Sequence, residues 1–331
     1  MAVNKGTFVI SLDYEIHWGV FDAMTLESYG ENLKNVNLVV DRLLVLCSKY
    51  EVKLTFATVG MLFADSKKEL LEFNPNLKPT YTNTKLDPYQ LIDSVGENEE
   101  RDNLHFAYSK IKDIQENSNH EIGTHTYSHY NCLAHGQTLE QFEQDVIAAK
   151  NIGLAKGINV ESIVFPKNQV NDEYLDICHK LGILSFRGTE ESRIYRTTGS
   201  KLKMKFVKLI RMTRLLDGYF NVTGHNTYKV EKINLNNGIV NLPSSRFLRP
   251  YFKVLKILEP LKVKRINRSM AYAAKNNEMF HLWWHPHNFG ADIDENFKNL
   301  EEIFKEYKKL NQKYKFESIT MSDLAKKILR K

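Results

Sequence analysis

The sequence predicts an α/β protein with a parallel sheet, and among parallel architectures it favours a barrel. Seven short apolar runs alternate with longer stretches of helical periodicity, which is the order typical of βα units. No G-x-G-x-x-G or G-x-x-x-x-G-K-[ST] motif follows any run, so the nucleotide-binding signal of an open, doubly wound sheet is missing. The 331 residues are 42% apolar and 26% charged, which excludes a disordered or collagen-like chain. We expect a single folded domain over residues 1–331.

Each strand is predicted where an apolar run ends in polar residues. The runs lie at 7–13, 53–60, 121–124, 162–165, 184–187, 239–242 and 279–285. Helices are predicted at 32–50, 294–313 and 320–329 from apolar residues spaced three and four apart. A further helix is predicted to begin after Thr138 and to reach about Ala155, because Thr138 and Gln141 have capping-box spacing.

Two stretches are predicted to be insertions into this alternation, at about 64–117 and 193–268. The second is strongly basic: it holds 18 Lys or Arg residues against three acidic ones, a balance of +15 within a chain whose net charge is +6. The remainder therefore sums to −9, which disfavours a nucleic-acid-binding protein. The basic stretch is either the solvated outside of the fold or a surface for an anionic membrane or a phosphate-bearing, lipid-linked substrate.

Cysteine usage and the N-terminus indicate a cytoplasmic protein. Cys47, Cys132 and Cys178 are far apart and form no C-x-x-C pair, which argues against a disulfide framework or a thiolate metal site. The first residues show neither the long apolar stretch nor the cleavage site of a signal peptide, and no window holds 18 apolar residues. The basic segment would allow peripheral contact with the inner membrane face.

The first chemical signal is Ser11-Leu-Asp13-Tyr-Glu15, at the end of the first predicted strand. Side chains alternate along a strand, so Asp13 and Glu15 are expected to point to the same side. In a parallel barrel the C-terminal strand ends form the active face. Two carboxylates there repel each other unless a cation or a proton lies between them; the alternative is a solvated strand end.

The second signal is His120-Glu-Ile-Gly-Thr-His125-Thr-Tyr-Ser-His129. An H-x-x-x-H spacing on a helical turn would place His125 and His129 on one face, close enough to bind one metal ion. Two imidazoles and one carboxylate would leave coordination positions open for water and substrate, as in a catalytic site. The alternative is a chance pair of surface histidines. Thr126 or Ser128 is expected to bond nearby backbone and to fix this turn.

The third signal is Phe280-His-Leu-Trp-Trp-His285-Pro-His-Asn-Phe-Gly290, at the end of the last predicted strand. Alternation places His281, Trp283 and His285 on one side of the strand. A histidine among tryptophans can be desolvated and can act as a general acid or base. The alternative is a core histidine under aromatic packing.

These three signals together resemble the motifs of the polysaccharide deacetylase family (the NodB-homology domain, carbohydrate esterase family 4). The T-F-D-D motif of that family is matched in part by residues 11–15, and its H-[ST]-x-x-H motif is matched in full by residues 125–129. Its L-x-H motif corresponds to residues 283–285, with Trp283 where a leucine usually lines the acetyl pocket. The order and spacing agree over residues 8–321.

The resemblance implies a distorted (β/α)7 barrel with insertions and a metal-dependent hydrolase that removes an acetyl group from an N-acetylated sugar. Such a sugar could be a saccharide or a phosphate-linked intermediate of cell-surface polysaccharide synthesis. The implied cofactor is a divalent metal, with Zn favoured over Co, Ni, Mn or Fe. The implied metal ligands are Glu15, His125 and His129, with Asp13 as general base and His285 as general acid. The roles of Asp13 and Glu15 could be exchanged.

The sequence departs from the family at its substrate contacts. The R-x-P motif appears as Val164-Phe-Pro166-Lys-Asn168 without its arginine, which normally orients the base carboxylate. Lys167 or Arg187 is expected to replace that arginine, and Pro166, Lys167, Asn168, Arg187 and Trp283 are the predicted substrate-binding residues. Two alternatives remain: an amidase acting on a small non-sugar amide, and a carbohydrate-binding homologue without catalysis.

Overall fold

The computed structural model describes residues 5–117, 119–192, 194–195 and 207–330. All seven predicted strands are present, as β1 (Thr7–Tyr14), β2 (Thr55–Thr58), β3 (Glu121–Thr124), β4 (Ser162–Ile163), β5 (Ser185–Phe186), β8 (Ile239–Asn241) and β10 (Glu278–Trp284). They lie in the order β10-β1-β2-β3-β4-β5-β8, with every neighbouring pair parallel. The predicted parallel α/β architecture is confirmed.

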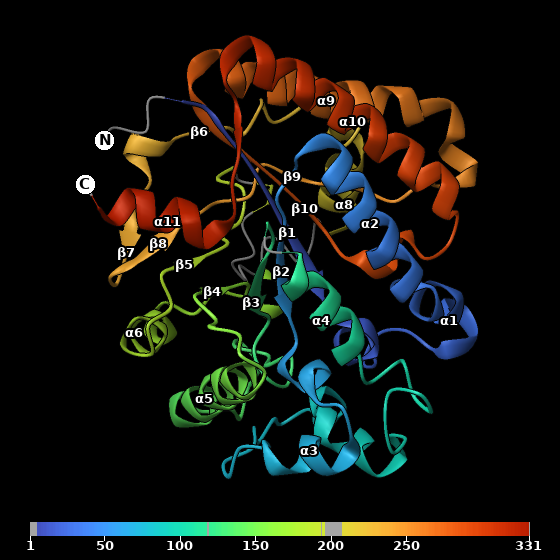
Figure 1. The fold of residues 1–331 in the computed structure, drawn as a ribbon, viewed down its shortest axis with the longest axis vertical. Coiled ribbons are helices and arrows are strands. Elements are labelled where there is room, and N and C mark those ends of the chain that lie inside the picture. The colour runs from blue at the N-terminus through green and yellow to red at the C-terminus, as the bar shows by residue number, and fades with distance from the viewer. Residues whose placement is uncertain (1–4, 118, 193, 196–206, 331) are drawn as a thin grey trace.

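The segment that contains β8 curls the sheet into a distorted barrel. β8 pairs with β5, while β9 (Arg246–Phe247), a few residues later on the same segment, pairs with β10 in parallel. One short segment thus links the two sides of the parallel sheet (Figure 1). The shorter strands extend its margins: β6 (Tyr228–Lys229) is antiparallel to β10, β7 (Leu235–Asn236) is antiparallel to β8, and β11 (Glu317–Ser318) is parallel to β1.

Helices surround the sheet (Figure 1). They are α1 (Leu26–Lys34), α2 (Val36–Tyr50), α3 (Lys67–Glu72), α4 (Tyr108–Glu116), α5 (Leu139–Ala155), α6 (Asp172–Lys180), α8 (Val207–Asp217), α9 (Glu259–Asn276), α10 (Ile293–Tyr314) and α11 (Met321–Leu329). The long helix α10 packs against both α9 and α2, and α5 packs against α6. The capping box predicted at the start of α5 is confirmed, because Thr138 and Gln141 bond each other's backbone N–H groups.

The predicted helix over 32–50 is divided in two. Asn35 has φ −88° and ψ 2°, which ends α1, and α2 begins at the next residue. The Asn35 side chain donates a 2.8 Å hydrogen bond to the carbonyl of Gly290, so a contact distant in sequence sets the break. The predicted helices over 294–313 and 320–329 are confirmed as α10 and α11.

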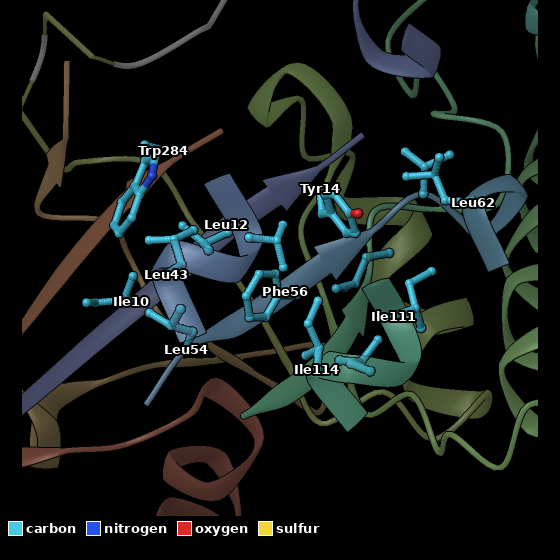
Figure 2. Close-up of a cluster of buried hydrophobic side chains, with 14 of the residues drawn as sticks. Ile10, Leu12, Tyr14, Leu43, Leu54, Phe56, Leu62, Ile111, Ile114 and Trp284 are labelled. Carbon is cyan, nitrogen blue, oxygen red and sulfur yellow. The ribbon is translucent and has the colours of Figure 1, made fainter. Parts of the chain in front are cut away.

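Strand alternation separates the core into an outer and an inner layer. The even-numbered residues of β1, among them Ile10, Leu12 and Tyr14, pack with the helices in one buried cluster. Figure 2 shows them beside Phe56. Val9 belongs to a second cluster, together with side chains of α11. Asp13 has the same parity as Val9 and therefore points into the barrel, where the site lies.

The range 193–268 contributes both to the barrel and to the outer surface. It supplies β6 to β9, α8 and the first half of α9, while residues 193 and 196–206 lie outside the described part. Part of its charge is internal: the Asp217 carboxylate lies 2.5 Å from Arg246 and 3.7 Å from Arg265, and all three residues are buried. The three cysteines are buried and free.

Candidate metal and catalytic site

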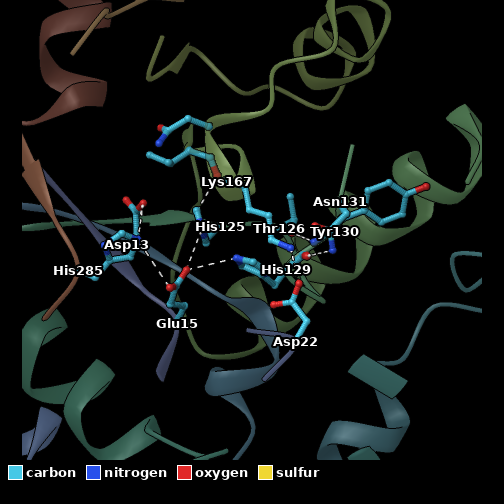
Figure 3. Close-up of polar contacts among 12 residues, drawn as sticks. Asp13, Glu15, Asp22, His125, Thr126, His129, Tyr130, Asn131, Lys167 and His285 are labelled. Atoms are coloured by element: carbon cyan, nitrogen blue, oxygen red, sulfur yellow. Dashed lines mark hydrogen bonds and ion pairs between the residues drawn. The ribbon is translucent and has the colours of Figure 1, made fainter. Parts of the chain in front are cut away.

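The three predicted motifs meet at the C-terminal ends of neighbouring strands. Asp13 and Glu15 stand at the end of β1, the loop with the two histidines follows β3, and His285 follows β10. Because β10, β1, β2 and β3 are adjacent and parallel, their ends lie at one edge of the sheet. Figure 3 shows the side chains pointing toward one another.

Asp13 is held by a buried arginine. Both guanidinium Nη atoms of Arg187 donate to the carboxylate of Asp13, at 2.6 and 2.8 Å, and the Arg187 side chain is fully buried. Burial alone would raise the pKa of Asp13, but the charges of Arg187, His125 and His285 offset it and lower this pKa below its ordinary value. Asp13 is therefore ionised and fixed in orientation.

Glu15 faces the two histidines of the second motif. Its Oε2 lies 3.2 Å from Nε2 of His125 and 3.3 Å from Nε2 of His129. Burial would raise the pKa of Glu15, but His285 and the contacts with the neighbouring histidines hold it well below its ordinary value. Burial lowers the pKa of His129, so its neutral form is favoured despite Glu15. The group combines one carboxylate oxygen with two imidazole nitrogens.

These three residues fit a divalent ion. Nδ1 of His125 donates a 2.8 Å hydrogen bond to the carbonyl of Val164, so the neutral ring carries its lone pair on Nε2. That buried Nε2 atom has no hydrogen-bond partner. A tetrahedral ion with bonds near 2.0–2.1 Å needs donor atoms about 3.3 Å apart, and the distances from Glu15 match this spacing.

The prediction that His125 and His129 lie on a helical turn is wrong. Residues 125–129 form a loop in which Thr126 and His129 have φ values of 64° and 55°, in the left-handed region. Thr126 Oγ1 accepts a 2.7 Å hydrogen bond from the N–H of Tyr130, as expected for this residue. Imidazole spacing on this loop is thus set by the loop conformation and not by helical periodicity.

Asp145, on α5, holds the histidine loop, and this role was not predicted from the sequence. Its buried carboxylate accepts hydrogen bonds from the N–H groups of Tyr127, at 2.7 Å, and Ser128, at 3.2 Å, and from the Ser128 hydroxyl. Burial nonetheless raises the pKa of Asp145 to about 6. An acidic residue in the middle of an amphipathic helix gives no sequence signal for this role.

The raised pKa of Asp145 predicts a pH dependence of stability. Between pH 3.8, the ordinary pKa of the group, and a pH of about 6, the Asp145 carboxyl is more protonated in the folded protein than in the unfolded chain. Its contribution to the free energy of unfolding therefore falls as pH rises. Relative to Asp145→Asn, the wild-type free energy of unfolding should drop by up to about 3 kcal/mol between pH 4 and pH 7. Urea unfolding of both proteins across this range measures the difference; a constant difference would contradict the assignment.

His285 is the most accessible group of the site. Its side chain is 23% exposed, against 3% for Asp13 and 4% for Glu15, and its Nε2 lies 3.5 Å from Asp13 Oδ2. Burial lowers the pKa of His285 against the opposing pull of the two carboxylates. Its Nδ1 donates to Oδ1 of Asn288 at 3.2 Å, which leaves Nε2 facing the carboxylates. By contrast, His281 is a core residue that contacts Ser11 and the carbonyl of Leu242.

The predicted substrate-binding residues differ in their contacts and in their burial. Arg187, one of the two candidates for the missing family arginine, contacts Asp13. The other candidate, Lys167, pairs with Asp22 at 2.6 Å. Asn168 Oδ1 accepts 2.8 and 3.3 Å hydrogen bonds from Arg187. Pro166 is buried at the start of the same turn. Trp283 is half-buried, with the Arg187 guanidinium 4.2 Å from its ring centroid.

His287 is a second residue of the site that was not predicted from the sequence. Its Nε2 donates to Glu15 Oε1 at 3.1 Å, and its Nδ1 accepts from the Tyr29 hydroxyl at 2.9 Å. Glu15, His285 and His287 could also hold an ion. With a second dication there, only the carboxylates of Asp13 and Glu15 would balance two dications and the Arg187 guanidinium. This excess of positive charge is unfavourable in a buried site. His287 is better explained as orienting Glu15.

Removing His287 should weaken metal binding without removing it. His287→Ala frees one Glu15 oxygen and should raise the Kd for Zn²⁺ by about 10- to 100-fold. Tyr29→Phe, which keeps the ring but loses the hydroxyl that fixes His287, should have a smaller effect in the same direction. Competitive chelator titration measures both; unchanged affinity in His287→Ala would show that Glu15 needs no such support.

Comparison with known proteins shows the family of the chain. The family model described as "Polysaccharide deacetylase" matches residues 20–185, about half of the chain. The chain belongs to the polysaccharide deacetylase family. The matched range of this deacetylase-family chain includes His125 and His129, while Asp13, Glu15 and His285 lie outside it. No curated protein sequence matches.

Solved structures show the same fold at low sequence identity. A protein assigned as a polysaccharide deacetylase from Mycobacterium smegmatis has a TM-score of 0.62 and 13% identity, covering 99% of this chain and 91% of its own. One assigned to the same class from Pseudomonas aeruginosa PAO1 has a TM-score of 0.51 and 10% identity, covering 98% and 90%. An allantoinase (Puue) has a TM-score of 0.54 and 12% identity, covering 97% and 88%. The predicted deacetylase-type barrel is thereby confirmed.

Proposed function

We propose that this protein is a metal-dependent hydrolase that removes the acetyl group from an N-acetylated sugar. The observation that carries the proposal is the meeting of three donor atoms, from Glu15, His125 and His129, beside an arginine-held Asp13 and an accessible His285. Zn²⁺ is the proposed ion, since one carboxylate and two imidazoles suit it; Co, Ni, Mn and Fe accept the same ligands.

We assign Glu15 as the metal ligand and Asp13 as the general base. Glu15 Oε2 lies near both histidine Nε2 atoms, whereas both oxygens of Asp13 are held by Arg187. A carboxylate already neutralised by a guanidinium is a poor partner for an ion, but its orientation suits proton transfer. We propose that Arg187 acts through Asp13 and does not touch substrate, because its side chain is fully buried.

Asp13 and His285 each carry out one of the two proton transfers. A bound divalent ion would polarise the acetamide carbonyl and lower the pKa of water at the site. Asp13 then removes the proton from the attacking water, and His285 donates a proton to the departing nitrogen, so acetate and a free amine are released. The 3.5 Å separation of Asp13 and His285 keeps both groups within reach of one reacting carbon.

Substrate contacts are proposed at the open side of the site. Trp283 packs against Phe247 and His285, with ring centroids 4.7 and 5.7 Å away, and offers an aromatic surface to the acetyl group or sugar ring. Pro166, Lys167 and Asn168 form the neighbouring turn, where the partly exposed Lys167 would have to leave its pair with Asp22 to meet a phosphate. Saccharides and phosphate-linked sugars are the proposed substrate class.

Acetate release from N-acetylated sugars tests the proposal. Purified protein should release acetate from N-acetylglucosamine oligomers or a nucleotide-linked N-acetylated sugar, should lose this activity with chelator and should regain it with Zn²⁺. Activity on small cyclic ureides alone would favour the amidase alternative. Saccharide binding without acetate release would favour the non-catalytic homologue.

No helix among the described residues combines the length and apolar character that a membrane crossing requires. The cytoplasmic location expected from the sequence stays a prediction. We propose one catalytic domain over residues 1–331, with contact to the inner membrane face through the basic segment.

A further inference from the structure

The helix α8 turns an apolar stripe toward solvent. Leu209, Met212, Leu216 and Phe220 are spaced by three or four residues and are 54%, 56%, 46% and 49% exposed. Residues at this spacing share one side of a helix and its continuation, and a surface helix ordinarily buries such a stripe. We call these four residues, with the exposed Lys208 and Arg211, the α8 face.

The exposed charged side chains of α8 are all positive. No acidic residue occurs from Val207 to Leu216, and Asp217, which follows, is buried against Arg246. The segment 249–258, which follows β9, repeats the pattern: it has no acidic residue, and its Val254 is 94% exposed beside the exposed Lys253. Apolar side chains among cations, without anions, match an anionic surface.

The helix α8 contacts the segment that ends beside the proposed site. β9 runs parallel to β10, so both strands end at the same edge of the barrel. Phe247, at the end of β9, lies with its ring centroid 6.1 Å from that of His285. Two residues later, Arg249 donates a 3.2 Å hydrogen bond to the carbonyl of Arg214 in α8. In β9 itself, Arg246 donates hydrogen bonds to the backbone carbonyl and the carboxylate of Asp217 in α8, so α8 and β9, which Figure 1 shows in one region, lie side by side.

Another surface feature fits an anionic partner less well. A groove of about 830 Å³ runs between α9 and α10, but its lining carries both Lys256 and Lys264 and the acidic Glu295 and Glu302. Mixed charge of this kind selects for no one ligand class. The α8 face differs in having one sign of charge around an apolar stripe.

We propose that the α8 face docks on an anionic lipid bilayer and thereby presents the site to a membrane-borne acetylated saccharide. Docking would place Leu209, Met212, Leu216 and Phe220 among the headgroups, with Lys208 and Arg211 facing lipid phosphates. The substrate part of this inference rests on the proposed deacetylase function. Membrane docking itself does not.

Vesicle sedimentation with the full chain tests the docking. Wild type should bind phosphatidylglycerol-rich vesicles at low salt at least about tenfold better than phosphatidylcholine vesicles, and high salt should weaken this binding. Leu209→Glu with Met212→Glu should abolish binding. The matched control is Leu154→Glu, on α5, because Leu154 is 56% exposed like Met212, and it should bind as wild type.

Three outcomes would overturn the inference: no wild-type binding to anionic vesicles at low salt, equal binding by the α8 double variant, or equal loss in Leu154→Glu. A different result would assign the face to a second copy of the chain. In that case light scattering would detect a wild-type dimer that binds no vesicles, and the double variant would be monomeric. Acetate release from a water-soluble sugar should be unchanged in the double variant. This assay separates failure of docking from failure of the proposed function.

Discussion

Replacing Asp13 with asparagine should abolish most of the catalysis and should also destabilise the protein. Loss of a general base typically lowers kcat by about 10²- to 10⁴-fold. In wild type the buried Arg187 guanidinium lies 2.6 Å from the Asp13 carboxylate, and the substitution leaves this guanidinium without a counter-charge. Breaking a buried ion pair in this way costs about 3–5 kcal/mol of unfolding free energy. Acetate release and urea unfolding measure the two effects separately.

A buried ion pair on α9 provides the control. Lys262 and Glu259 lie 2.6 Å apart, with 2% and 7% exposed side chains, outside the cluster of site residues. Glu259→Gln should likewise lower the unfolding free energy but leave kcat close to that of wild type, because distant sites act independently. Asp13→Asn with nearly wild-type kcat would contradict the assignment of the base. Equal loss of kcat in Glu259→Gln would attribute the effect to general instability.

Replacing both His125 and His129 with alanine should remove the metal. Wild type is expected to bind one Zn²⁺ per chain. The double variant should bind none at micromolar Zn²⁺, because only Glu15 remains of the three donors and the neighbouring His287 presents a protonated Nε2 to Glu15. Catalysis should fall by at least about 10³-fold, since a bound ion supplies several kcal/mol of barrier reduction. Elemental analysis after dialysis gives the stoichiometry.

His120 is the matched control for this double variant. It lies five residues before His125, and its Nδ1 accepts a 3.1 Å hydrogen bond from the N–H of Leu54, away from Glu15. His120→Ala should therefore keep one Zn²⁺ per chain. Unchanged stoichiometry in the double variant, or loss of the ion in His120→Ala, would place the metal elsewhere.

The strands of the barrel could be predicted because their signal is local. An apolar run followed by polar residues marks a buried strand that ends at the active edge, and β3 was predicted at its observed bounds. The helix over 32–50 was less predictable, since Asn35 ends α1 through a bond to Gly290 that no local pattern records. The histidine loop was predicted as a helical turn because spacing cannot reveal the left-handed φ values of Thr126 and His129.

The site was predictable in membership and only in part in its supports. Arg187, directly after β5, was one of two candidates to orient the base, whereas Asp145 and His287 reach the site from α5 and the turn after β10 as single polar residues without motif spacing. By sequence alone, Lys167 and Arg187 are equal candidates for the missing arginine. The structure separates them, because Lys167 pairs with Asp22 and Arg187 with Asp13.

The sequence by itself determined which residue types are available and in which order the strands present them. It could not distinguish the roles of Asp13 and Glu15, since residues two apart at a strand end point to the same side. Only the tertiary structure decided their surroundings: Glu15 lies 3.2 and 3.3 Å from the two histidines, and Asp13 lies 2.6 Å from Arg187. The difference arises because partners from β3 and β5 approach the two carboxylates from different strands, and such distances are set by packing and not by sequence spacing.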